Sequence, residues 1–255
     1  MILARSIAEL DVARDGIVGL VPTMGALHAG HAALLRAARA ECDVLVASVF
    51  VNPAQFSDDA DLSAYPRDLE EDASKAQAEG VDVLFAPSTG EMYPPGFATW
   101  VDPGGVAEGL EGAHRPGHFR GVATVCVKLF NIVRPQRAWF GRKDAQQVAM
   151  LEQLVRDLNL PVEIRVVETV RDTDGLALSS RNARLSRAER EQARAIPRAL
   201  ATRDVDAARA VLAEAGLEPD YVAVRDLDGP TLAIAATVGT TRLIDNVPLR
   251  EGAAP

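Results

Sequence analysis

Several features are scarce in this chain of 255 residues, and each absence excludes a class of protein. The only cysteines, Cys42 and Cys126, lie in apolar stretches, so we expect buried free thiols and a reducing compartment rather than a disulfide scaffold. No apolar run is long enough to cross a bilayer. The N-terminal segment MILARSIAEL is charged and lacks a signal-peptide core. We therefore expect a cytoplasmic protein with no membrane segment.

Basic charge is also in deficit. The chain has 27 Lys and Arg against 36 Asp and Glu, which gives a net charge of -9. This balance argues against general nucleic-acid binding, although it is compatible with a local basic pocket for a phosphate. With 48% hydrophobic residues, the length allows one large domain or two unequal ones, each with a proper core.

The first 170 residues alternate between short apolar runs and amphipathic segments. The alternation predicts strands at 16–22, 43–51, 81–85, 138–140 and from 162, and helices at 31–41, 68–79, 121–133 and 144–158. Four or five such alternations predict an α/β fold, a doubly wound parallel sheet with helices on both faces. The Pro- and Gly-rich segments 52–66 and 86–120 are too long for simple connections, so we expect functional loops there.

The pattern changes after Val170. Ser186 and Glu189 form the S-x-x-E signature of a capping box, and Pro197 is expected to end or kink the helix that follows. A helix near 204–215 and short strands at 221–224, 231–238 and 242–244 predict a small α+β domain with an antiparallel sheet. We therefore predict domains at 1–170 and 171–255.

Polar clusters follow the ends of the predicted strands, where open parallel sheets bind their ligands. The clusters are His28 and His31; Asn52 and Gln55; Lys143, Asp144 and Gln147; and Ser179, Ser180 and Arg181. Their convergence is expected from topology.

Three alternatives remain open for the two histidines on their sequence alone. At the start of a helix they could both donate hydrogen bonds to a phosphate. They could bind a metal ion, although zinc needs further ligands and few candidates remain. They could also be one structural cap and one surface imidazole.

The other clusters have similar double interpretations. Lys143 offers a point charge for a phosphate and Gly141 permits close approach of a ligand, but Asp144 could be a plain N-cap beside a solvated lysine. The segment LSSRN suits a polyphosphate or is a polar turn. The loop EGAHRPGHFRG is an anion site or a solvated basic loop.

Six motifs in this order resemble the pantoate–β-alanine ligase (pantothenate synthetase) family. They are PTMGALHAGH, VNPAQF, YPRD, RPGHFRGV, FGRKDAQQ and DGLALSSRN, and the similarity resumes at RLIDN. The resemblance implies a Rossmann-like nucleotidyltransferase domain with a small C-terminal lid, in a cytoplasmic homodimer.

The resemblance also implies a reaction in two steps. The carboxylate of (R)-pantoate attacks the α-phosphate of ATP, which is bound with Mg²⁺, and gives pantoyl adenylate and pyrophosphate. The amine of β-alanine then attacks the acyl carbon and gives pantothenate and AMP. Small molecules are thus the expected partners, and no metal site formed by protein side chains is predicted.

Carried over position by position, the resemblance assigns the site residues. The implied catalytic residues are His31, His28, Lys143 and Arg181. The implied ATP contacts are Met24, Gly25, Ala26, Leu27, His28, Ala29, Gly30, His31, Gly141, Arg142, Lys143, Asp144, Val170, Leu178, Ser179, Ser180 and Arg181. The implied contacts to pantoate and β-alanine are Gln55, Gln147, Asn52, Arg115 and His118.

One departure leaves alternatives open. Arg142 stands where the family usually has Glu, in FGEKD. Pointing outward it would be harmless, and pointing inward it would add a charge beside Lys143. Two other functions compete with the ligase: a nucleotidyltransferase with another small acceptor, which H-x-G-H alone does not exclude, and a nucleotide-binding protein without turnover, which Arg142 would favour.

Overall fold

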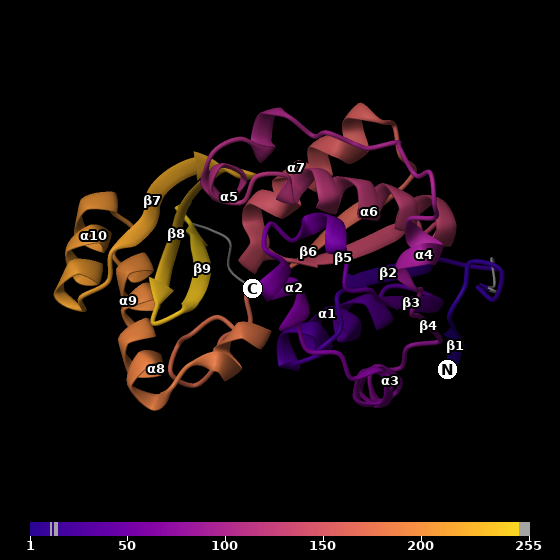
Figure 1. The fold of residues 1–255 in the computed structure, drawn as a ribbon, viewed down its shortest axis with the longest axis horizontal. Helices are drawn as coiled ribbons and strands as arrows, with labels where there is room; N and C mark the ends of the chain where they lie inside the picture. Colours follow the sequence, from indigo (N-terminus) through magenta and orange to yellow (C-terminus); the bar gives the residue numbers. More distant parts are fainter. Residues whose placement is uncertain (11, 13–14, 250–255) are drawn as a thin grey trace. The chain divides into compact units, whose positions relative to one another are not determined.

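The computed structural model describes residues 1–10, 12 and 15–249, and these fall into two compact units (Figure 1). The first unit consists of Met1–Gly141 and Gln146–Val167. The second consists of Arg142–Ala145 and the residues from Glu168 onward, of which 250–255 lie outside the described part. The sequence-based domains 1–170 and 171–255 remain a prediction.

A six-stranded parallel sheet forms the centre of the first unit. Its strand order is β1 (Ile2–Ala4), β4 (Val83–Phe85), β3 (Val44–Val49), β2 (Val18–Thr23), β5 (Arg137–Gly141) and β6 (Glu163–Val167). The chain runs outward from β2 through β3 to β4, then crosses back to β5 on the other side. This reversal confirms the predicted doubly wound sheet and places its switch point between β2 and β5.

Alternate strand residues build a core on each face of the sheet, as the period of a strand requires. Leu20 and Val46 pack with α6 (His118–Val133) and α7 (Ala145–Asp157). Val21 and Leu45 pack on the other face with α1 (Ala29–Arg39) and α3 (Leu69–Ala78). Figure 1 shows these helix pairs on opposite sides of the strands. The observed bounds lie within a few residues of those predicted from periodicity.

The long segments 52–66 and 86–120 contain short helices that periodicity does not reveal. These are η1 (Pro53–Gln55), α2 (Asp59–Ser63), α4 (Thr89–Met92), η2 (Gly105–Ala107) and α5 (Leu110–His114). One-turn helices are too short for an apolar repeat to form. One of them, η1, carries Gln55 to the carboxyl edge of the sheet, as described below.

The second unit is an antiparallel sheet packed with helices. Strands β7 (Pro219–Asp226), β8 (Pro230–Val238) and β9 (Thr241–Pro248) pair in that order. Its helices are η3 (Arg142–Asp144), η4 (Ser180–Arg184), α8 (Arg187–Ala193), α9 (Ala195–Ala201) and α10 (Val205–Glu214). The capping box of Ser186 and Glu189 is present at α8, and the helical run breaks at Arg194, just before Pro197. The predicted α+β architecture is confirmed.

Among the described residues, no helix combines the length and the apolar character needed to cross a membrane. Cys42 and Cys126 are buried and unpaired, as expected. Burial raises the pKa of the Cys126 thiol to about 12, and it also raises the pKa of Cys42.

Because the thiolate is the reactive form of cysteine, we expect the native protein to resist modification by a thiol reagent such as Ellman's reagent at pH 8. Unfolding in guanidinium chloride should then expose both thiols to rapid reaction. The absorbance of the released thiolate measures both rates. Rapid labelling of the native protein would contradict the buried environment of these side chains.

Candidate active site

The two histidines lie at the turn from β2 into α1. His28 is the N-cap of α1, and its Nδ1 accepts the Gly30 N–H at 3.1 Å. The Nδ1 of His31 accepts the His28 N–H at 3.3 Å, so the two side chains form a reciprocal capping box. Their ring centroids are 4.1 Å apart, and both residues are half-buried.

These bonds fix the tautomer of both imidazoles. Accepting a backbone N–H requires a lone pair on Nδ1, so the proton of each neutral ring is on Nε2. An Nε2–H group can donate to a phosphate oxygen, and a helix N-terminus favours anions. The same two side chains can therefore cap the helix and donate to a phosphate, two roles that the sequence left as alternatives.

A buried carboxylate holds the loop before His28. Asp72 on α3 is 2% exposed and accepts the backbone N–H groups of Ala26 at 2.9 Å and Leu27 at 2.7 Å. These bonds support a strained turn, since Gly25 and Ala26 have φ of 82° and 51°. Asp72 is absent from the sequence-based site, because one acid in a polar helix gives no signal of a distant partner.

The segment after β3 contributes a second cluster at the same edge of the sheet. The Asn52 Nδ2 donates to Gln55 Oε1 at 3.0 Å, and the Gln55 Nε2 lies 3.0 Å from Met24 Sδ. Three residues of the sequence-based site, from the loops after β2 and β3, are thus brought together.

The basic loop, which the sequence leaves as an anion site or a solvated loop, contacts Gln55 in this structure. Arg115 Nη1 lies 3.1 Å from His118 Nε2, and His118 Nδ1 lies 2.9 Å from the Gln55 carbonyl oxygen. Since Arg115 only donates, His118 accepts through Nε2 and donates from Nδ1 to Gln55. His118 is 6% exposed, so its contact is with the protein. Direct contacts of Arg115 and His118 with a substrate remain predictions.

The two consecutive glutamines of α7 have different surroundings. Gln146 is buried and bonds the backbone of the preceding long loop, accepting from Glu111 N–H and donating to the carbonyl of Val106. Gln147 is half-buried, and its side chain has no hydrogen bond to any described residue. Gln147 therefore keeps the polar capacity that a substrate contact requires.

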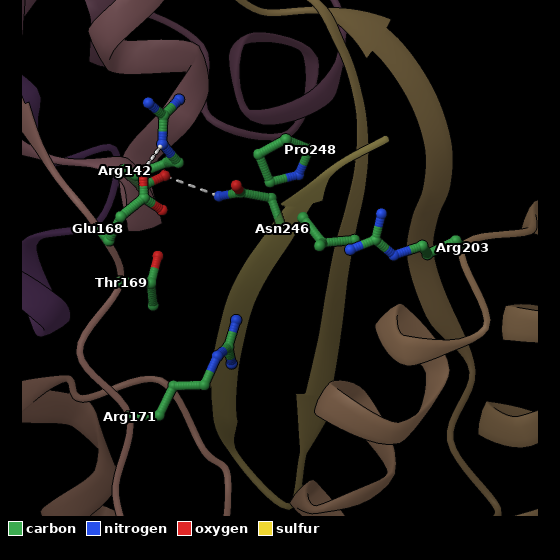
Figure 2. A pocket seen from close by; sticks show the side chains of 8 residues that line it. Arg142, Glu168, Thr169, Arg171, Arg203, Asn246 and Pro248 are labelled. Carbon is green, nitrogen blue, oxygen red and sulfur yellow. Dashed lines mark hydrogen bonds and ion pairs between the residues drawn. The ribbon is translucent and has the colours of Figure 1, made fainter. Parts of the chain in front are cut away.

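Arg142 is directed away from Lys143. Its Nε lies 2.6 Å from Glu168 Oε1, whereas Lys143 Nζ lies 3.5 Å from Asp144 Oδ1. Figure 2 shows the Arg142–Glu168 pair beside Asn246, whose Nδ2 donates to the carbonyls of Arg142 and Lys143 at 2.9 Å each. The pair lines a cavity of about 220 Å³ with Thr169, Arg171, Arg203, Asn246, Val247 and Pro248. The ion pair with Glu168 favours the outward orientation of Arg142, which adds no charge beside Lys143.

Reversing this ion pair provides a test of its role. We expect Arg142→Glu to cost about 0.5–1 kcal/mol of unfolding free energy, because two carboxylates would then face each other. The double variant Arg142→Glu/Glu168→Arg should recover the loss, and the KM for ATP should stay within about twofold if the side chain is outside the ATP site. Denaturant titration and ATP saturation curves measure both. A failure of the double variant to recover would contradict the pairing.

Five further predicted ATP residues, Val170, Leu178, Ser179, Ser180 and Arg181, lie in the second unit. The Leu178 N–H donates to the Val170 carbonyl at 2.9 Å, and Ser179 caps η4 by accepting the Arg181 N–H. These bonds bring together Val170, Leu178 and the start of LSSRN. Gly141 closes β5 in the first unit, and a Cβ there would meet no atom of the described residues within 4 Å beyond its two chain neighbours, which is the open space expected beside a ligand. The convergence of the two units on ATP remains a prediction.

No group of three or more His, Cys, Asp or Glu is placed to hold a metal ion in the part of the chain that the structure describes. Within the first unit, His28 and His31 follow β2, Asn52 and Gln55 follow β3, and Gln147 follows β5, all at the carboxyl edge of one parallel sheet. Such an edge beside the switch point is where doubly wound sheets bind nucleotides. The arrangement can therefore hold a phosphate beside a small polar molecule.

Comparison with known proteins supports this assignment. The model of a family described as pantoate-beta-alanine ligase matches residues 3–248. The chain is 57% identical to the pantothenate synthetase of Roseiflexus castenholzii over 203 residues, which are 78% of this chain and 73% of that protein.

Two solved structures are similar throughout. Pantothenate synthetase from Thermus thermophilus is 45% identical with a TM-score of 0.90, covering 98% of this chain and 99% of its own. A Francisella tularensis pantoate-beta-alanine ligase, complexed with beta-gamma ATP and beta-alanine, is 36% identical with a TM-score of 0.89, and both chains are fully covered. This chain therefore belongs to the pantoate–β-alanine ligase family.

Proposed function

We propose that this chain condenses (R)-pantoate with β-alanine at the expense of ATP, giving pantothenate, AMP and pyrophosphate through a pantoyl-adenylate intermediate. Its membership of the ligase family carries the proposal. The capping box of His28 and His31 supports it, because it orients two donors at the N-terminus of α1. The pairing of Arg142 with Glu168 removes the observation that favoured a protein without turnover.

In the first step, a carboxylate oxygen of pantoate attacks the α-phosphorus of ATP, and the bond from that phosphorus to the bridging oxygen of pyrophosphate breaks. The reaction requires no protein nucleophile, only positioning and charge stabilisation. His28 and His31 would donate to phosphate oxygens, while Lys143 and Arg181 would supply positive charge. ATP would enter as its Mg²⁺ complex.

In the second step, the β-alanine amine attacks the acyl carbon, the amine loses a proton and the acyl–oxygen bond to AMP breaks. Gln55 and Gln147 would hold the pantoyl group in place for this attack. Because an acyl adenylate is labile in water, the second unit would act as a lid that excludes solvent. We also propose that the enzyme is a cytoplasmic homodimer, as the resemblance implies.

Product analysis tests this reaction directly. With ATP, pantoate and β-alanine present, we expect AMP and pyrophosphate to accumulate in equal amounts with pantothenate. Omitting any one substrate should abolish steady AMP formation. AMP released continuously without pantoate or without β-alanine would contradict the ligase, and ATP binding without turnover would favour the inactive alternative.

A further inference from the structure

Asn52 has all of its hydrogen-bonding capacity engaged by protein groups. Its Nδ2 donates to Gln55 Oε1 at 3.0 Å and to the Gly121 carbonyl at 3.1 Å. Its Oδ1 accepts from Ala54 N–H at 3.2 Å and from Tyr93 OH at 2.9 Å. A primary amide has two donors and two acceptor lone pairs, so none remains. Asn52 is also 1% exposed, which favours a positioning role over the substrate contact that the resemblance implied.

The orientation of Asn52 determines which end of the Gln55 amide faces the site. Because Asn52 presents only its NH₂ to Gln55, Gln55 must present its oxygen to Asn52. Its NH₂ group then points the other way, toward Met24 in the loop before the histidines. These hydrogen bonds thus all run in one direction: Tyr93 donates to Asn52, and Asn52 donates to Gln55. The series ends on the N–H donor of Gln55, which is suited to an anionic or hydroxylated substrate.

Tyr93 is the first donor in this series of hydrogen bonds, and its ring lies in an aromatic cluster. Its ring packs 5.1 Å from that of Phe97 and stacks 6.0 Å from that of Trp100, centroid to centroid. Burial is the main cause that raises the pKa of the Tyr93 hydroxyl above its usual value, so the group remains a proton donor throughout the physiological range. Sequence reasoning did not find this residue.

The backbone around Gln55 is equally constrained. A Cβ at position 121 would lie 2.2 Å from the Ala54 carbonyl oxygen, so only glycine allows α6 to approach η1 this closely. His118 holds the Gln55 carbonyl from the same helix. Because the backbone of Gln55 is fixed in this way, the direction of its side-chain amide depends on the hydrogen bonds that link Tyr93, Asn52 and Gln55.

We propose that Tyr93 is a positioning residue for pantoate: acting through Asn52, it keeps the Gln55 amide turned so that its N–H donor faces the substrate. The inference rests on the proposed ligase activity. Tyr93 acts through Asn52 and not on the reacting atoms, so loss of its hydroxyl should weaken pantoate binding and leave ATP binding unchanged.

The test uses pantoate-dependent exchange of pyrophosphate into ATP, without β-alanine, on the full chain. Tyr93→Phe keeps the ring and removes only the hydroxyl. We expect the KM for pantoate to rise about fivefold, the factor of one lost hydrogen bond, while the KM for ATP changes little and the Tm falls by about 2–4 °C. Phe97→Leu is the matched control: it disturbs the packing of the ring and should lower the Tm without changing the KM for pantoate.

A double-variant cycle decides whether Tyr93 acts through Asn52. In an Asn52→Ala background, Tyr93→Phe should have no further effect on the KM for pantoate. Three results would overturn the inference. They are an equal rise of the KM for pantoate and the KM for ATP in Tyr93→Phe, the same rise of the KM for pantoate in Phe97→Leu, and additive effects of Tyr93→Phe and Asn52→Ala on the KM for pantoate. If Asn52→Ala does not fold, the comparison of Tyr93→Phe with Phe97→Leu still decides. No exchange in the unaltered protein would refute the ligase itself, which is a different outcome.

Discussion

Replacing His31 by alanine is expected to lower pantoate-dependent pyrophosphate exchange about 10²–10³-fold, the usual loss when one donor to a transition-state oxyanion is removed. The effect on stability should be far smaller. The variant loses the bond from the His28 N–H to His31 Nδ1 at the start of α1. One capping interaction is worth about 1 kcal/mol, which lowers the Tm of a chain of this size by about 2–4 °C.

A second substitution at the same position separates the two roles of the ring. Glutamine is a standard partner at this position of a capping box, so His31→Gln should recover most of the stability that alanine loses. Exchange should stay low, because the imidazole Nε2–H is still missing. If glutamine recovers activity and stability together, His31 is only a cap.

The second large effect is expected at Asp72. Asp72→Asn replaces one carboxylate oxygen by an NH₂ group that would face a backbone N–H of Ala26 or Leu27. Losing a buried, charge-assisted bond costs about 1.5–3 kcal/mol of unfolding free energy. The turn at Gly25 and Ala26 would relax and displace the N-cap, so we expect the KM for ATP to rise about tenfold and kcat to fall. Denaturant titration and exchange kinetics measure these changes.

The matched control for Asp72 is its neighbour on the same helix. Glu71 pairs with Lys75 at 2.9 Å, and its side chain is 59% exposed. Lys75 also donates to the Leu27 carbonyl at 2.7 Å, a bond that Glu71→Gln leaves in place. The variant should therefore change the unfolding free energy by less than about 1 kcal/mol, as exposed ion pairs do, and leave the KM for ATP unaltered. Equal losses in the two variants would contradict a specific role of Asp72 in holding the loop before His28.

The fold could be predicted largely from the sequence, because its main elements are long enough to show a period. The β-branched run at Val44–Val49 and the apolar stripe of α6 are examples. Strand β1 was missed, since Ile2–Ala4 is too short for a pattern and is defined only by its pairing with β4. The one-turn helices in the two long loops were missed for the same reason.

The site could be predicted only in part. The position of His28 and His31 between a strand and a helix followed from the pattern, but their mutual capping is a property of three-dimensional geometry. Asp72 and Tyr93 could not be found, because each acts on residues far away in the chain. Each of the two residues is identified by a hydrogen bond in the structure, and a single sequence does not reveal such a bond.

The fate of a pantoate oxygen tests the central claim most directly. With pantoate labelled by ¹⁸O in its carboxylate, attack on the α-phosphorus makes a labelled oxygen the bridge of the adenylate. Attack of β-alanine at the acyl carbon then leaves that oxygen on the departing nucleotide. The account predicts one labelled oxygen in AMP and none in pyrophosphate, as measured by mass spectrometry. Unlabelled AMP, or label in pyrophosphate or phosphate, would contradict it.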